Sequence, residues 1–307
     1  MRKPFLVLAA FVALALAGCP EPIPKAEPEQ KPPQADLAAG HAREPVLNVL
    51  TLKRPLEPEW FGLYIRGQKA GWSRLELDRE TIAGRDVLVG RSESVLEATV
   101  GGKHVQRRVV EERTYEARPG GPLLSFRAEW SGDGGDRLVS GRCEAKRCEA
   151  GLENADGSRM TRVLDDVDET ADQADSVRLA AARRATVDGE SLDLEKLRVR
   201  EIRTAFVRRE RIAGAGVETE VSLVTESETE DRIPYEYRVA DDGRVVEIRF
   251  GEAIVARPEP EGIARRLDRV DLFALARVAL PKPLPTGVVP AQIAYGLRGL
   301  PPAFQKS

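Results

Sequence analysis

The chain has 307 residues, with 47 Lys and Arg against 50 Asp and Glu, and a formal net charge of −3. This near balance gives no electrostatic reason to expect binding to nucleic acid or adhesion to anionic lipid. After the N-terminal segment, no run approaches 18 consecutive apolar residues, so we expect no membrane-spanning helix there.

The first 18 residues predict a secretory signal peptide. Arg2 and Lys3 supply positive charge, and residues 5–16 form an apolar run too short to span a bilayer. The run ends in Leu16-Ala17-Gly18-Cys19, which resembles the lipobox of bacterial lipoproteins. The resemblance implies a lipid such as palmitate on Cys19, with cleavage before it. The alternative is an ordinary secretory signal followed by a chance Cys.

The resemblance also bears on localisation. Bacterial lipoproteins with Asp after the lipidated Cys are commonly retained in the inner membrane, whereas Pro20 stands there in this chain. We therefore expect a lipid-anchored protein of the outer membrane that faces the periplasm. Residues 19–47 are rich in Pro and mixed in charge, which predicts a tether without a packed core.

Residues 48–257 predict an antiparallel β-rich body, because apolar and polar residues alternate with period two. The clearest alternation runs through 124–130, 217–223, 233–239 and 245–250. Turn signals separate the runs, at Gly67-Gln68, Gly101-Gly102, Asp133-Gly134-Gly135, Asp156-Gly157 and Asp242-Gly243. The expected fold class is mainly β: curved antiparallel sheets built from hairpins, with the 235–250 hairpin as the clearest local prediction.

One helix is expected inside the β body. Residues 175–185 are rich in Ala, Leu and Arg, and Asp172 or Asp175 could cap them. We expect this helix to pack across a curved sheet. The alternative is a lid or partner helix. Residues 258–307 predict a Pro-rich extension that packs on the body, with a short helix at 263–272 and a last strand at 293–297.

Two cysteines lie close together in the body. Cys143 and Cys148 are separated by four residues and are expected to flank a tight turn, which favours a structural disulfide in an exported protein. The alternatives are free thiols, a redox pair or half of a metal site. The only His residues are His41 and His104, which leaves too few ligands for a structural zinc site.

The sequence does not predict a catalytic site. It contains no G-x-S-x-G elbow and no phosphate-binding glycine motif. A cluster of acidic residues is interpreted as a solvated turn, with a cation site as the alternative: Asp165, Asp166, Asp168, Glu169 and Asp172. We expect no metal, no cofactor and no enzymatic activity.

One motif is more distinctive: Trp60-Phe61-Gly62-Leu63-Tyr64-Ile65-Arg66-Gly67-Gln68-Lys69-Ala70-Gly71-Trp72. It resembles the opening of the β-rich N-terminal region that precedes the catalytic domain in bacterial transglutaminase-like proteins. The family pattern is an aromatic residue, then Gly-x-Tyr, then Gly-x-Lys-x-Gly-Tyr, and Trp72 replaces the common Tyr. The similar order of features extends over residues 58–302.

That resemblance implies an accessory module without the enzyme. In the family a papain-like domain with catalytic Cys, His and Asp follows, and no position of this chain matches those residues. We therefore predict a lipid-anchored, non-catalytic binding or scaffolding module of the cell envelope, whose partner is an envelope protein or a peptidoglycan-linked molecule. The alternatives are a carrier of lipid or another apolar ligand in a sheet-lined cavity, and an accessory part of a transglutaminase- or protease-like system.

Overall fold

A computed structural model describes residues 47–272, except 215–216 and 229–232. All the described residues belong to one compact unit, Pro45–Leu275. The predicted signal peptide, Cys19, most of the tether and the predicted strand at 293–297 lie outside the described residues.

The body is a single antiparallel sheet of 14 strands, which confirms the mainly β fold class. The sheet consists of two meanders, in each of which sequential strands are neighbours. The first meander contains β1 (Glu59–Ile65), β2 (Gln68–Ile82), β3 (Arg85–Val100), β4 (Lys103–Glu116), β5 (Leu123–Gly132), β6 (Arg137–Glu144), β7 (Arg147–Asn154) and β8 (Arg159–Leu164). The second contains β9 (Thr186–Asp193), β10 (Arg198–Gly214), β11 (Val217–Glu228), β12 (Tyr235–Ala240), β13 (Val245–Phe250) and β14 (Ile254–Pro258).

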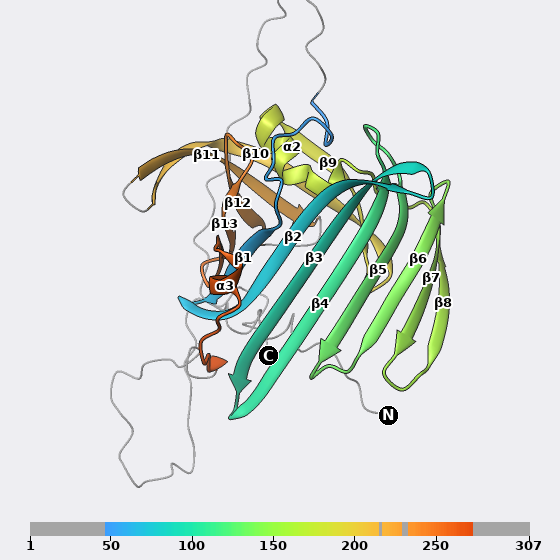
Figure 1. Cartoon of the computed structure of the whole chain (residues 1–307), viewed down its shortest axis with the longest axis horizontal. Coiled ribbons are helices and arrows are strands. Elements are labelled where there is room, and N and C mark those ends of the chain that lie inside the picture. The colour runs from blue at the N-terminus through green and yellow to red at the C-terminus, as the bar shows by residue number, and fades with distance from the viewer. Residues whose placement is uncertain (1–46, 215–216, 229–232, 273–307) are drawn as a thin grey trace, which may run out of the picture. The chain divides into compact units, whose positions relative to one another are not determined.

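The pairing of β1 with β14 joins the two meanders in the middle of the sheet. Figure 1 shows β2 to β8 of the first meander as one run of neighbouring strands. β1 and β14 pair antiparallel, with Phe61 opposite Pro258 and Ile65 opposite Ile254. The two edges of the sheet are β8 and β9, which are consecutive in the chain. A contact between the first and the last strand of the body therefore makes one sheet out of two.

The predicted alternation accounts for the strands at several positions. In β5, Phe126, Ala128 and Trp130 are buried whereas Arg127 is exposed. The β12–β13 hairpin pairs Tyr235 with Phe250, as predicted, but begins at Tyr235 rather than at Ile233. The first turn also differs: it lies at Arg66-Gly67, one residue earlier than predicted, and Gly67 adopts a φ of 84° there.

The intervening helix is confirmed but shorter than expected. α2 spans Ser176–Arg183, preceded by the 3-10 turn η1 (Gln173–Asp175), and contacts β9 to β12. Asp175 is its N-cap residue, yet its carboxylate makes no capping hydrogen bond. The helix predicted at 263–272 is wrong in extent, because α3 occupies only Glu261–Ala264. No helix among the described residues is long and apolar enough to cross a membrane.

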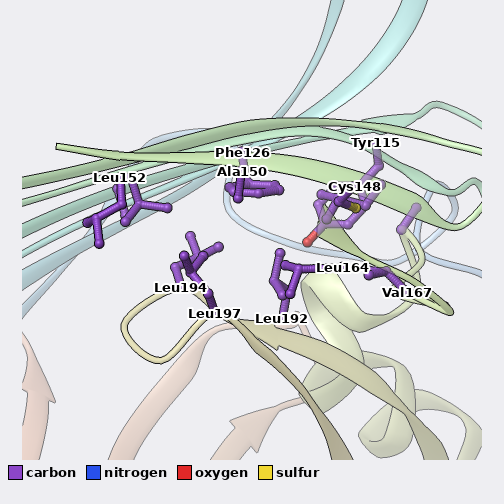
Figure 2. Packing of buried hydrophobic residues seen from close by; sticks show 14 of the residues in the cluster. Tyr115, Phe126, Cys148, Ala150, Leu152, Leu164, Val167, Leu192, Leu194 and Leu197 are labelled. Carbon is purple, nitrogen blue, oxygen red and sulfur yellow. The ribbon is translucent and has the colours of Figure 1, made fainter. Parts of the chain in front are cut away.

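The largest apolar core lies between the first meander and the β9–β10 turn. Figure 2 shows Phe126, Ala150 and Leu152 on the sheet facing Leu192, Leu194 and Leu197 from the opposite side. These three leucines are at most 2 % exposed. Full burial of a Leu side chain contributes roughly 1.5–3 kcal/mol relative to exposure, so this contact is a main source of stability for the folded-over sheet.

Candidate functional site

A pocket of about 200 Å³, lined by charged and apolar side chains, lies where three parts of the chain meet. Its walls come from residues 54–59, from the middle of β2, β3 and β4, and from residues 174–178 around η1 and α2. The charged residues that line it are Arg54, Glu57, Glu59, Glu76, Arg91, Glu111, Arg113, Asp175 and Arg178. The pocket is therefore rich in charge of both signs.

Gly90 leaves room in the sheet wall of this pocket. In register, Gly90 of β3 lies between Leu77 of β2 and Arg113 of β4. A Cβ at Gly90 would lie 3.5 Å from Leu77 Cδ1, an ordinary contact distance. A larger side chain at this position would thus enter the pocket without a backbone clash.

Arg113 and Glu169 form a buried ion pair beside the pocket. Arg113 Nη1 donates to both carboxylate oxygens of Glu169 at 2.8 Å, and Arg113 Nη2 donates to the Leu192 carbonyl at 2.9 Å. Tyr115 Oη donates to Glu169 Oε1 at 2.6 Å, and the Leu192 N–H donates to Oε2 at 2.6 Å. This cluster holds residue 169 and the end of β9 against β4.

Burial and neighbouring charge shift the pKa values of Arg113 and Tyr115 in this cluster. Burial alone would lower the pKa of Arg113, but the negative charge of Glu169 raises it overall. Burial and the same carboxylate raise the pKa of Tyr115 well above its usual value. Arg113 therefore carries a permanent positive charge at the pocket wall, and Glu169 compensates it.

Arg178 anchors helix α2 to the opposite wall. Its Nη1 donates to Asp175 Oδ1 at 3.0 Å, and its Nη2 pairs with Glu59 at the start of β1. Its Nε donates to the Gly243 carbonyl in the β12–β13 turn. Burial alone would lower the pKa of Arg178, but the two carboxylates raise it overall.

Two buried polar atoms on pocket-lining side chains have no hydrogen-bond partner among the described residues. They are Asp175 Oδ2 and Arg54 Nη1. The Asp175 side chain is only 4 % exposed. An unsatisfied buried polar atom costs roughly 1–3 kcal/mol. Both atoms have almost no accessible surface, so they lie behind the pocket wall and not in the space that a ligand could enter.

A half-buried carboxylate lies outside the pocket, under α2. Glu226 of β11 accepts hydrogen bonds from Ser176 Oγ at 3.2 Å, Thr204 Oγ1 at 3.3 Å and Tyr237 Oη at 3.3 Å. Burial raises the pKa of Glu226, and the hydroxyl groups offset only part of that rise.

The distinctive motif at 60–72 forms a clamp on the segment that follows β14. Lys69 Nζ donates to Glu259 Oε2 at 2.6 Å and to the Ile263 carbonyl at 2.9 Å, and Tyr64 Oη donates to the same carboxylate. The Lys69 backbone also exchanges two hydrogen bonds of 2.9 Å with Asp268. We call Tyr64, Lys69, Glu259 and Asp268 the hairpin clamp.

The other motif residues allow or reinforce this clamp. The guanidinium of Arg265 lies 4.6 Å from the ring centroid of Trp60 and 4.5 Å from that of Trp72, at cation–π distance. A Cβ at Gly62 would lie 2.6 Å from Glu259 Oε2, and one at Gly71 would lie 2.2 Å from the Val95 carbonyl oxygen. The motif thus has a structural explanation in the position of residues 259–268.

The predicted disulfide is confirmed. Cys143 and Cys148 are bonded across the β6–β7 hairpin, where they are paired in register. In this bonded state neither sulfur is a thiolate. His104, one of the two His residues weighed as zinc ligands, lies in β4. Its Nε2 is 3.6 Å from Glu97 Oε1, and its side chain is 60 % exposed.

The interpretation of the acidic cluster as a solvated turn is wrong for one of its members. Asp165 and Asp168 have side chains 68 % and 53 % exposed, whereas Glu169 is 2 % exposed and paired with Arg113. In the described part of the chain, no group of three or more His, Cys, Asp or Glu side chains is arranged to hold a metal ion.

Sequence reasoning did not identify the pocket, Arg54, Asp175 or the Arg113–Glu169 pair. Each depends on contacts between segments far apart in the chain. The one usable signal was Gly90, a glycine that lies within the predicted β-rich body and in the middle of β3, because such a glycine often marks a close approach of the backbone or of a ligand.

Comparisons of the chain with protein-family models, with curated proteins and with solved structures find no match.

Proposed function

We propose that this chain is a lipid-anchored protein of the cell envelope whose β body acts as a non-catalytic binding module. The observation that carries the proposal is the pocket of about 200 Å³, whose wall combines arginine side chains with carboxylates from three parts of the chain. The lipid anchor rests on the sequence around Cys19.

The core packing favours this function over that of an apolar-ligand carrier. A carrier needs an apolar cavity, and pockets that bind drug-sized molecules have volumes of roughly 300–1,000 Å³. Here Phe126 and Trp130 are buried in the core, and Leu192, Leu194 and Leu197 pack against the sheet (Figure 2). The pocket of about 200 Å³ is lined mainly by polar and charged residues.

The anchor is tested by metabolic labelling with palmitate in the native host. We expect label in the wild-type chain and none in Cys19→Ala, which should also leave the membrane fraction. Equal labelling or equal membrane retention of the two chains would contradict the anchor.

The binding role is tested by crosslinking in intact envelopes. We expect a defined partner to be captured by the wild-type chain and lost in Gly90→Val, which places a side chain in the pocket. The matched control is Gly151→Val, because Gly151 also lies within a strand and its Cβ would be 3.8 Å from the nearest atom. If the Gly90→Val chain still captures the partner, the pocket is not the binding site.

The hairpin clamp favours a second candidate, an accessory role beside a transglutaminase- or protease-like enzyme. The motif that resembles that family holds the segment after β14 through Lys69 and Glu259. If this role is correct, Lys69→Met should abolish association with such an enzyme, whereas Lys103→Met, at an exposed hairpin position, should not. Unchanged association in Lys69→Met would count against it.

A further inference from the structure

We propose that Trp60 and Trp72 form a cage for the guanidinium group of an arginine on a partner protein, and that Arg265 of this chain fills the cage as an autoinhibitory plug. The cage lies on the β1–β2 hairpin, where α3 contacts both strands (Figure 1). The two rings are not among the residues that line the pocket, so this site is additional to the one proposed above.

The two tryptophan rings hold one cation between them. Their centroids are 5.3 Å apart and their planes are inclined by 42°. The guanidinium of Arg265 lies over both rings, 4.6 Å from the centroid of Trp60 and 4.5 Å from that of Trp72. A cation within about 6 Å of a ring centroid is attracted by the negative face of the ring, and Trp gives the strongest attraction. The pair therefore forms a site for one flat cation.

The strands fix the walls of the cage. Trp60 of β1 is opposite Arg74 of β2, and Trp72 lies two residues before Arg74, so both rings share one face of the sheet. Trp72 is only 6 % exposed and packs with Val95 of β3 and Ala264 of α3. The rings thus keep their positions whether or not a cation lies between them.

The plug is held on its outer side by one exposed ion pair. Arg265 Nε donates to Glu261 Oε1 at 2.9 Å, and the two side chains are 47 % and 55 % exposed. An ion pair with this exposure contributes little to stability. The side chain of Arg265 can therefore turn outward into water at a small cost.

The segment that carries the plug stays in place without it, because the hairpin clamp holds this segment separately. Lys69 Nζ donates to Glu259 Oε2 at 2.6 Å and to the Ile263 carbonyl at 2.9 Å. The Lys69 N–H donates to Asp268 Oδ2 at 2.9 Å on the far side of the plug. Removal of the Arg265 side chain should therefore open the cage and leave the backbone around it unchanged.

The bound position of Arg265 defines the chemistry of the partner group. A guanidinium is flat and weakly hydrated and stacks on aromatic faces, whereas the ammonium of Lys is a compact and strongly hydrated charge. An arginine of a partner would have to displace Arg265. Its apparent affinity is therefore reduced in proportion to the fraction of molecules whose cage is open.

The test is an NMR titration of the full chain in detergent, with isotope label on the tryptophan indole N–H groups. The probe is N-acetyl-L-arginine methylamide, and the control probe is the citrulline analogue, which has a similar shape and no charge. Arg265→Ala should bind the arginine probe at least about tenfold more tightly than wild type does. The signals of Trp60 and Trp72 should shift, and that of Trp130, buried in the main core, should not.

Two results of this titration would overturn the inference. One is equal affinity of Arg265→Ala and wild type for the arginine probe. The other is equal affinity of Arg265→Ala for the arginine and citrulline probes. If Arg265→Ala disturbs α3, as an altered Trp130 signal or altered hydrogen exchange at Ala264 would show, Arg265→Gln decides by the same two criteria.

Matched variants assign the binding to the cage. Arg266→Ala changes the next residue, which is also exposed, and should leave the affinity within about twofold of wild type. Trp60→Leu added to Arg265→Ala should weaken binding of the arginine probe by at least about tenfold. Unchanged affinity in this double variant would contradict the cage.

A further variant separates the cage from the pocket. Gly90→Val added to Arg265→Ala should not change the affinity for the arginine probe, because Gly90 lines the pocket. Loss of binding in this variant would place the probe in the pocket and overturn the cage. Retained binding, together with partner capture that Gly90→Val does not affect, would leave the cage standing and remove the pocket as the binding site.

Discussion

Two regions of the body shield a glutamate from water, fully at Glu169 and partly at Glu226, and they stabilise it by different means. Beside the main core, Glu169 receives two hydrogen bonds from the guanidinium of Arg113. Under α2, Glu226 receives its hydrogen bonds from the hydroxyl groups of Ser176, Thr204 and Tyr237. Both carboxylates therefore tie segments together, but only Glu169 has a cation beside it, whereas burial raises the pKa of Glu226 and three hydroxyl groups offset only part of that rise.

The largest expected effect is at Glu169. Glu169→Gln keeps the size of the side chain but removes the main counter-charge of Arg113, which is only 15 % exposed. Arg113 then keeps only the carboxylate of Glu111, at 3.5 Å. We expect a loss of about 3 kcal/mol in the free energy of unfolding, measured by chemical denaturation. The control is Glu153→Gln at an exposed ion pair, which should change stability little. If Glu169→Gln lowers the free energy of unfolding no more than Glu153→Gln does, the comparison between Glu169 and Glu226 is wrong.

The disulfide lies in the same region as Glu169 and should stabilise that region alone. Replacing both Cys143 and Cys148 by Ala should lower the free energy of unfolding by about 2 kcal/mol. Hydrogen exchange should then quicken in β6 to β8 more than in β10 to β12. Equal acceleration in both regions would show that they unfold as one unit under these conditions.

Glu226 should make the free energy of unfolding fall as pH rises. The pKa of Glu226 is raised by burial, so the folded state holds the proton more tightly than the unfolded state does. Stability is therefore full below the ordinary glutamate pKa and falls as pH rises through the higher folded-state pKa. Glu226→Gln should remove this fall and gain about 1 kcal/mol at pH 7, with little change at pH 4. A variant less stable than wild type at pH 7 would contradict this account.

The smallest effect is expected from Thr204→Val, which removes one of the hydroxyl groups that bond to Glu226. We expect a loss of about 0.5 kcal/mol at pH 4, from one hydrogen bond. The loss should grow as pH rises, because the ionised carboxylate depends more on its donors than the neutral acid does. Parallel stability curves for Thr204→Val and wild type between pH 4 and pH 7 would argue against hydroxyl support of the charge.

Much of the local structure could be predicted from the sequence, because it depends on neighbours in the chain. The alternation in β5, the 235–250 hairpin, the helix before β9 and the cysteine pair all follow from short-range patterns. The error at Ile233 is small, because a bend there delays the start of β12 to Tyr235. The error at 263–272 is larger: α3 ends at Ala264, and Asp268 is hydrogen-bonded to the backbone of Lys69 instead of continuing a helix.

The candidate site could not be predicted in the same way. Arg54 and Asp175 belong to segments more than one hundred residues apart, and nothing local marks them as members of one pocket. Glu169 was assigned to a solvated turn because its neighbours in sequence are acidic, yet its partner Arg113 is 56 residues away. A charged residue can be buried when an ion-pair partner compensates its charge, and a single sequence does not reveal which residue that partner is.

The pairing of β1 with β14 has a consequence for the order of folding. When the first eight strands have been synthesised, one side of β1 is still an open edge, because its partner at Ile254–Pro258 lies almost two hundred residues further along the chain. Such a distant closure slows folding, and an open edge can pair with the wrong chain in the meantime. Nascent molecules would therefore be most exposed to aggregation in the interval between release of the first meander and arrival of the last strand.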